Sequence, residues 1–134
     1  MDTACLNYEA TGESLIFPNV RPTMGQLHEI LLSIGVPPNI HGYSYIVYSM
    51  ELIMNDPQAM YSVTKGLYID VAKKFNTKPT SVERSIRFAI GSAWKYGNQE
   101  LIHSIFKSCI RPYKSAPSNS VFLSRLYYYL INCK

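Results

Sequence analysis

Three charged residues in the middle of the chain, Glu83, Arg84 and Arg87, are of types that recognise nucleic acid bases. An arginine guanidinium can donate two hydrogen bonds to O6 and N7 of guanine in the major groove of DNA. A glutamate carboxylate can accept one hydrogen bond from the amino group of cytosine. A recognition helix makes such contacts when it presents the charged side chains on a face opposite the core.

The residues around them predict an amphipathic helix over positions 80–96. At about 100° per residue, its apolar positions fall within an arc of roughly 100°, and Arg84, Arg87 and Lys95 lie on the opposite side. Both arginines lie in the first half of the helix, the half that a recognition helix inserts into the major groove, while Lys95 is placed to contact a phosphate. The side predicted to face the core consists of Val82, Ile86, Ala89, Ile90, Ala93 and Trp94.

The start of this helix is predicted at Thr80, because Glu83 follows three residues later and completes a capping box. In a capping box the carboxylate accepts a hydrogen bond from a backbone N–H, which is a more ordinary role for Glu83 than a contact with cytosine. The two roles are compatible if Glu83 exchanges one for the other on binding DNA.

An apolar pattern over residues 57–76 predicts another helix ahead of this one, with a break allowed at Gly66. Residues 76–79 form a short link between the two helices. Residues 64–95 together have the outline of a helix-turn-helix, whose second helix enters the major groove. Many helices that bind no DNA are also basic outside and apolar inside. A solvated basic face is therefore the alternative explanation of the pattern alone.

Four more helices and no strand are predicted elsewhere, so we expect an all-α, six-helix bundle. The first begins with a capping box of Thr23 and Gln26 and ends at Gly35. Asn98 is expected to cap a short helix that carries Leu101, Ile102, Ile105 and Phe106. The remaining ranges are a helix over 43–54, a loop over 111–119, a last helix over 120–131, an N-terminal arm over 1–22 and a single domain over 23–134.

Size and composition favour one globular domain. The chain has 134 residues, of which 47% are hydrophobic and 16% charged. No stretch is long and apolar enough for a transmembrane helix, and the acidic N-terminus lacks the basic region of a signal peptide. Residues 1–62 carry one basic and six acidic residues, whereas residues 63–95 carry seven basic and two acidic. A basic block of this kind attracts polyanions such as DNA.

Cysteine and histidine residues indicate neither a disulfide framework nor a catalytic site. The cysteines, Cys5, Cys109 and Cys133, are scattered and odd in number, which favours a reducing, cytoplasmic location. The histidines are isolated from one another, and no serine or cysteine lies in a nucleophile motif. We therefore expect a protein that is not an enzyme, with no metal site and no cofactor.

Five runs of sequence are characteristic when taken together. They are EILLSIGVP at 29–37, IHGYSY at 40–45, SVTKGLY at 62–68, DVAKKFNT at 70–77 and VERSIRFAI at 82–90. Together they resemble the C-terminal DNA-binding effector domain of the response regulators that initiate sporulation, the stage zero sporulation protein A family. The resemblance covers about residues 23–131. The family's fold is a six-helix bundle with a helix-turn-helix, which agrees with the helices expected above.

The resemblance implies transcription control through a short promoter box on double-stranded DNA. Copies placed in tandem on adjacent boxes and RNA polymerase are the further partners that it implies. By match with the family's Val-Glu-Arg-x-x-Arg stretch, Glu83, Arg84 and Arg87 are the implied base-contacting residues. Candidates for contact with the DNA backbone are Lys65, Lys73, Lys74, Ser81 and Lys95.

The chain departs from better-known members of that family at three positions. Ser81 replaces an arginine and Phe88 a histidine, which is expected to weaken backbone contacts or alter flanking preferences. Ile69 replaces a proline, which should make its helix more continuous.

Full-length members also place a receiver domain upstream, whereas 22 residues precede the match here, so we expect a stand-alone protein. That expectation leaves a second hypothesis, a protein-interaction module that keeps the effector fold and modulates another regulator. Ser81 and the tyrosines at 127–129 favour this alternative. We expect Tyr127 in the core and Tyr128 and Tyr129 partly exposed.

Overall fold

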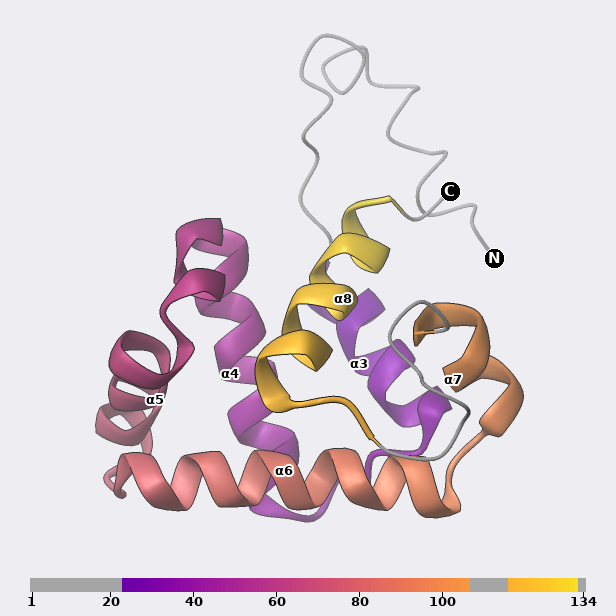
Figure 1. Ribbon diagram of the computed structural model, residues 1–134, viewed down its shortest axis with the longest axis horizontal. Helices are drawn as coiled ribbons and strands as arrows, with labels where there is room; N and C mark the ends of the chain where they lie inside the picture. The colour runs from indigo at the N-terminus through magenta and orange to yellow at the C-terminus, as the bar shows by residue number, and fades with distance from the viewer. Residues whose placement is uncertain (1–22, 107–115, 133–134) are drawn as a thin grey trace, which may run out of the picture.

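The computed structural model describes residues 23–106 and 116–132, and over these ranges the protein is the predicted all-α bundle. The predicted arm, residues 1–22, lies outside the described residues. Figure 1 shows the longest helix, α6, along one edge of the molecule, with the other helices stacked on one side of it. The described α-helices are α3 (Met24–Ile34), α4 (His41–Asn55), α5 (Tyr68–Phe75), α6 (Pro79–Tyr96), α7 (Gln99–Phe106) and α8 (Asn119–Ile131).

The capping signals of α3 are confirmed at both ends. Gln26 N–H donates to Thr23 Oγ1 at 3.0 Å, and Thr23 N–H donates to Gln26 Oε1 at 2.9 Å. At the other end Gly35 has φ 105°, a left-handed conformation that glycine adopts without steric cost. Asn98 N–H donates to the Ile34 carbonyl at 3.2 Å, which ties the end of α3 to the segment between α6 and α7.

The prediction of one helix over residues 57–76 is wrong. A 3-10 helix, Pro57–Tyr61, ends at Ser62, whose φ of −136° and ψ of 49° lie outside the helical region. A π-helical turn, Val63–Leu67, follows and leads into α5. The helix is therefore interrupted at Ser62, ahead of Gly66, where the break was expected. Apolar spacing could not reveal this, because buried side chains continue across it: Met60, Val63, Leu67 and Val71.

The core lies between α6 and the helices stacked on it. Phe106 of α7 and Phe122 of α8 stack with ring centroids 5.1 Å apart, and Trp94 of α6 meets both rings at steep angles. The predicted core face of α6 is confirmed at five positions, because Val82, Ile86, Ala89, Ile90 and Ala93 are at most 1% exposed. At the sixth, Trp94 is only partly buried.

A glycine at the start of α4 allows α6 to cross α4 closely. A Cβ at Gly42 would collide with the Ser85 carbonyl oxygen and would lie 2.8 Å from the Cβ of Ala89. Both contacts belong to α6, so the absence of a side chain at position 42 sets the distance between the two helices.

Candidate nucleic-acid interface

The helix α6 does not begin with the predicted capping box. It starts at Pro79, and Lys78 is the N-cap residue, with φ −103°, ψ 148° and no hydrogen bond from its side chain. Proline suits the first helical position because it lacks an N–H that would be left unbonded there, and it keeps the residue before it extended. Thr80 is therefore the second helical residue, and Glu83 lies too far along the helix to cap it.

A connection of three residues, 76–78, sets α6 against α5 (Figure 1). Asn76 has φ 55° and ψ 52°, a left-handed conformation. Its N–H donates to the Lys73 carbonyl at 3.4 Å, and Thr77 N–H donates to the Ala72 carbonyl at 2.9 Å. This pair of bonds closes α5 as a Schellman motif and redirects the chain into α6.

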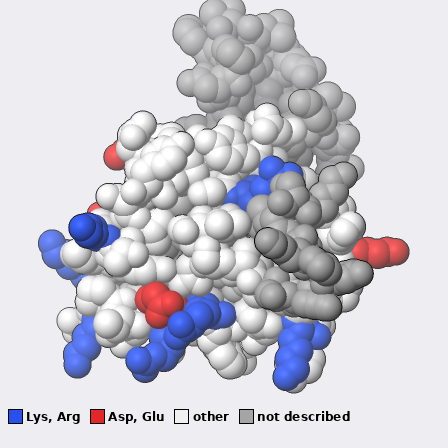
Figure 2. All heavy atoms as spheres, in the orientation of Figure 1, with Lys and Arg blue, Asp and Glu red and all other residues white. Residues whose placement is uncertain are grey.

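The side of α6 that faces away from the core is exposed. The Arg87 side chain is 61% exposed and Phe88 is 64% exposed, and Arg84 and Lys95 are exposed as well. Figure 2 shows Lys and Arg side chains along the edge of the molecule where Figure 1 places α6. Arg84 and Lys95 are separated by about 16 Å along the helix axis. The structure thus brings the predicted arginines and this lysine onto one free face.

Glu83 pairs with Arg87 one helical turn further on, instead of capping the helix. Arg87 Nη1 lies 3.2 Å from Glu83 Oε2, and the side chains are 61% and 37% exposed respectively. Water screens such a pair, which contributes about 0.3–0.5 kcal/mol to helix stability. The pair directs the Arg87 guanidinium toward Glu83 before any ligand is bound.

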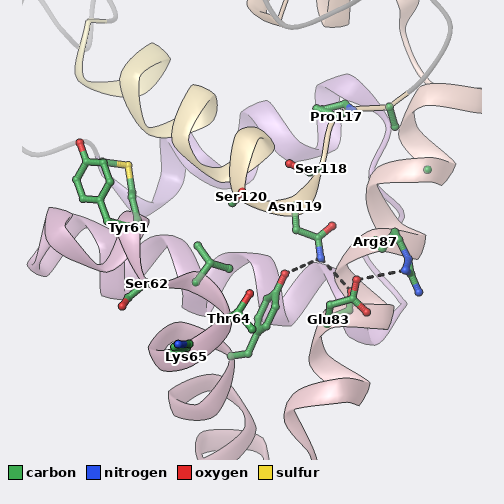
Figure 3. A pocket seen from close by; sticks show the side chains of 15 residues that line it. Tyr61, Ser62, Thr64, Lys65, Glu83, Arg87, Pro117, Ser118, Asn119 and Ser120 are labelled. Atoms are coloured by element: carbon green, nitrogen blue, oxygen red, sulfur yellow. Dashed lines mark hydrogen bonds and ion pairs between the residues drawn. The ribbon is translucent and has the colours of Figure 1, made fainter.

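Asn119, the first residue of α8, connects three helices behind this ion pair (Figure 3). Its Nδ2 donates to the Tyr68 hydroxyl of α5 at 2.9 Å and to the Glu83 backbone carbonyl of α6 at 3.0 Å. Asn119 and Tyr68 are each 6% exposed. Burial raises the pKa of the Tyr68 hydroxyl above its usual value, against the opposing effect of the bond from Asn119. Asn119 therefore holds the backbone of α6 at Glu83, next to the Glu83–Arg87 ion pair.

Sequence reasoning missed this role of Asn119, because residues 111–119 were expected to form a loop. The described end of that segment instead starts α8, and Val121 N–H donates to Ser118 Oγ at 3.3 Å as an N-cap bond. The available signal was serine at the cap position, three residues ahead of the apolar residues of the helix.

A groove of about 910 Å³ opens beside the ion pair, between the π-helical turn, α6 and the start of α8 (Figure 3). Lys65 and Arg87 line it together with the hydroxyl-bearing residues Ser62, Thr64 and Ser118. The structure therefore places Lys65, from the segment before α5, on the Arg87 side of α6.

The other residues predicted to contact the DNA backbone lie at the ends of α5 and α6. Lys73 and Lys74 are exposed in the last turn of α5, and Lys74 Nζ lies 5.4 Å from the centre of the Tyr48 ring. Ser81 is partly buried in the first turn of α6. Lys95 Nζ, in the last turn of α6, lies 5.4 Å from the centre of the Tyr96 ring.

Two histidines, His28 and His41, contact tyrosine rings, whereas His103 is exposed on α7. His28 Nδ1 lies 2.7 Å from the Tyr43 hydroxyl, and His41 stacks on Tyr45 with ring centres 6.1 Å apart. Residues 23–106 and 116–132 contain no group of three side chains that could hold a metal ion. Within the same ranges no helix has the length and apolarity needed to cross a bilayer. The cysteines lie outside the described residues.

The tyrosines at 127–129 differ slightly from expectation. Tyr127 and Tyr129 are both partly buried against the core, and Tyr128 is 42% exposed. The run therefore presents one exposed ring, and Tyr127 is not fully buried.

The fold and the face described above agree with a comparison against protein families. The family model described as "Sporulation initiation factor Spo0A C terminal" matches residues 27–130. This range includes all the base-contacting candidates and all but the outermost residues of α3 and α8. The resemblance drawn from the sequence is thereby confirmed, and the chain belongs to the Spo0A C-terminal family, a family of DNA-binding domains of a sporulation regulator.

Proposed function

We propose that this protein is a sequence-specific regulator of transcription that binds a short promoter box, with α6 in the major groove of DNA. In this proposal α5 and α6 form a helix-turn-helix, and the function is related to the control of sporulation. One observation carries the proposal: the cations of α6 share one exposed side of a helix whose opposite side is buried.

The dimensions of α6 suit a major groove. A helix with its side chains is about 10–12 Å across, and the major groove of B-DNA is about 12 Å wide. In Figure 1 no other described helix lies against the outer edge of α6. A basic helix presented in this way can enter the groove without rearrangement of the bundle.

Arg84 and Arg87 are the proposed guanine-contacting residues, and Glu83 has a double role. In the free protein Glu83 is paired with Arg87. Because that pair is exposed, exchanging it for a guanine contact costs little. Glu83 is then released to accept a hydrogen bond from the amino group of cytosine.

The remaining cations are proposed to contact phosphates on either side of the groove. Lys65 lines the groove beside Arg87, whereas Lys73 and Lys74 lie at the end of α5. Lys95 lies at the end of α6, and Ser81 lies in its first turn. Such contacts strengthen binding to any sequence and make it salt-dependent.

Partners and location follow from the same proposal. Copies of the protein occupy adjacent promoter boxes in tandem, a bound copy contacts RNA polymerase, and the protein works in the cytoplasm. The described residues assign no separate surface to a second copy or to the polymerase.

Two sets of variants test the proposed function. The preferred duplex would first be selected from a randomised DNA library, and affinity would then be measured by fluorescence anisotropy at two salt concentrations. Each of Arg84→Ala and Arg87→Ala should cost about 1–3 kcal/mol of binding free energy and relax base preference at one position. Their folding stability should change by less than about 0.5 kcal/mol.

The matched control is the double variant Arg84→Lys/Arg87→Lys. It keeps both charges but cannot form the bidentate contact, so it should bind DNA with little preference among sequences and a nearly unchanged salt dependence. If the Arg84→Ala/Arg87→Ala variant kept wild-type affinity and selectivity, the proposal that α6 contacts the bases would be wrong. Tight binding of a protein partner with no DNA binding at low salt would favour the interaction-module hypothesis.

A further inference from the structure

Phe88 is an unusual residue for the exposed side of α6. Its side chain is 64% exposed, although phenylalanine is among the residue types most often buried. It belongs to neither the buried core nor the partly buried set packed against the core, and it makes no ring contact with another aromatic residue of the described ranges. Folding therefore gives no reason for an aromatic ring at this position.

Its position on the helix places Phe88 with the base-contacting candidates. At about 100° per residue, Phe88 lies roughly 40° from Arg84 around the helix and about 6 Å further along the axis. Arg87 precedes it directly in the sequence, on the other flank of Arg84. Successive bases along one DNA strand are about 3.4 Å apart. A helix lying along the groove therefore brings the ring to an edge roughly two base pairs from the one that Arg84 meets.

The major groove presents one apolar group that a phenyl ring can recognise. Base edges there expose hydrogen-bond donors and acceptors, and thymine alone adds a methyl group at C5. Cytosine presents only hydrogen at the equivalent carbon. The exposed Phe88 ring, next to the arginines, is therefore suited to contact a thymine next to the guanines.

We propose that Phe88 is a specificity-determining residue that selects thymine through its C5 methyl group. The inference rests on the proposed function, because it requires α6 to lie in the major groove. It assigns to the promoter box one thymine whose methyl group packs against the ring, in addition to the bases contacted by Arg84 and Arg87. Burying one methyl group against the ring should strengthen binding about three- to fivefold.

Replacing thymine by deoxyuridine tests this contact directly, because the exchange removes the methyl group and keeps the hydrogen-bonding edge. Each thymine of the selected duplex would be replaced in turn, and affinity would be measured for the wild type and for Phe88→Ala. We expect the affinity of the wild type to fall about three- to fivefold when the thymine at one position is replaced. Phe88→Ala should bind the thymine and deoxyuridine duplexes equally at that position.

Two further variants distinguish the specific role of the Phe88 ring from the general effect of losing an aromatic side chain. Tyr96→Ala removes a ring that is 78% exposed on the same helix but at its far end, and it should keep the wild-type deoxyuridine penalty. Phe88→Leu keeps an apolar side chain and should retain part of the penalty. Thermal unfolding of each variant should match the wild type, because the substituted side chains lie outside the core.

The outcomes distinguish this inference from the proposed function. If Phe88→Ala kept the full deoxyuridine penalty, or if no position showed a penalty in the wild type, the role of Phe88 would be wrong. The proposed function would still stand if binding remained sequence-specific and dependent on the two arginines. If no duplex were bound specifically, both proposals would fail.

Discussion

The two sides of α6 differ in what they contribute to the protein. On the inner side Val82 and Ile86 are fully buried, and on the outer side Arg87 and Phe88 are more than 60% exposed, although all four belong to the same two turns. Truncating a side chain on the inner side leaves a cavity in the core. Truncating one on the outer side leaves space that water fills. The comparison predicts that substitutions on one side change folding and those on the other change binding.

The largest effect is expected for Ile86→Ala on the inner side. Ile86 is 0% exposed, so its truncation should lower the free energy of unfolding by about 2–5 kcal/mol. Urea unfolding followed by circular dichroism measures this loss. Arg84→Ala, two residues away on the outer side, is the control and should change stability by less than about 0.5 kcal/mol. Equal losses in the two variants would remove the distinction between the two sides.

A pair of glycine substitutions sharpens the comparison by predicting opposite signs. Gly42→Ala would push a methyl group against the Ser85 carbonyl of α6, at a cost of about 1–3 kcal/mol. Gly91→Ala adds the same methyl group to the outer side of α6, where no atom outside the adjoining stretch of the helix lies within 4 Å, and should stabilise the helix by about 0.5–1 kcal/mol. Chemical denaturation of both variants checks the signs, and a stabilising Gly42→Ala would contradict the close approach of α4 and α6.

Tyr68→Phe tests the hydrogen bond from Asn119, the residue that also donates to the Glu83 carbonyl of α6. Loss of the bond from Asn119 should cost about 0.5–1.5 kcal/mol at pH 7. The pKa of Tyr68 is raised in the folded protein, so its contribution to stability is complete below the unfolded value near 10 and is lost as the pH rises through the folded pKa. Unfolding free energies should therefore fall less steeply above pH 10 in Tyr68→Phe than in the wild type. An alkaline profile of Tyr68→Phe as steep as that of the wild type would contradict a raised pKa of Tyr68.

The smallest effect is expected for Lys73→Gln, at the exposed end of α5. If Lys73 contacts one phosphate, the slope of log affinity against log salt should decrease by about 0.9, with similar losses for all DNA sequences. Lys73→Arg keeps the charge and should keep the slope. A change in base preference would instead assign Lys73 to the base-contacting set.

Local signals in the sequence predicted well those parts of the fold that depend on neighbouring residues. The capping box of Thr23, the end of the first helix at Gly35 and the buried positions of α6 were all predicted, because each depends on residues within one or two turns. The start of α6 was not, because Pro79 fits the first helical position better than Thr80 fits the cap.

Contacts between distant segments could not be predicted in the same way. Asn119 bonds to Tyr68 and to Glu83, which lie 51 and 36 residues away. No spacing rule connects such positions, so the support behind the candidate interface became visible only in the folded bundle. The position of Phe88 is different, because helical spacing alone places it on the outer side of α6 beside Arg84.

The anchoring of α6 by its neighbours has a thermodynamic consequence. Asn98 N–H is bonded to Ile34 just beyond one end of the helix, Gly42 abuts its middle, and Asn119 holds the Glu83 carbonyl near the other end. A helix fixed in this way is preorganised, and its association with a partner requires no coupled folding. Titration calorimetry should therefore record a heat-capacity change that corresponds to the contact surface alone. Within the described residues, the adjustment expected in the complex is then limited to side chains such as the Glu83–Arg87 pair.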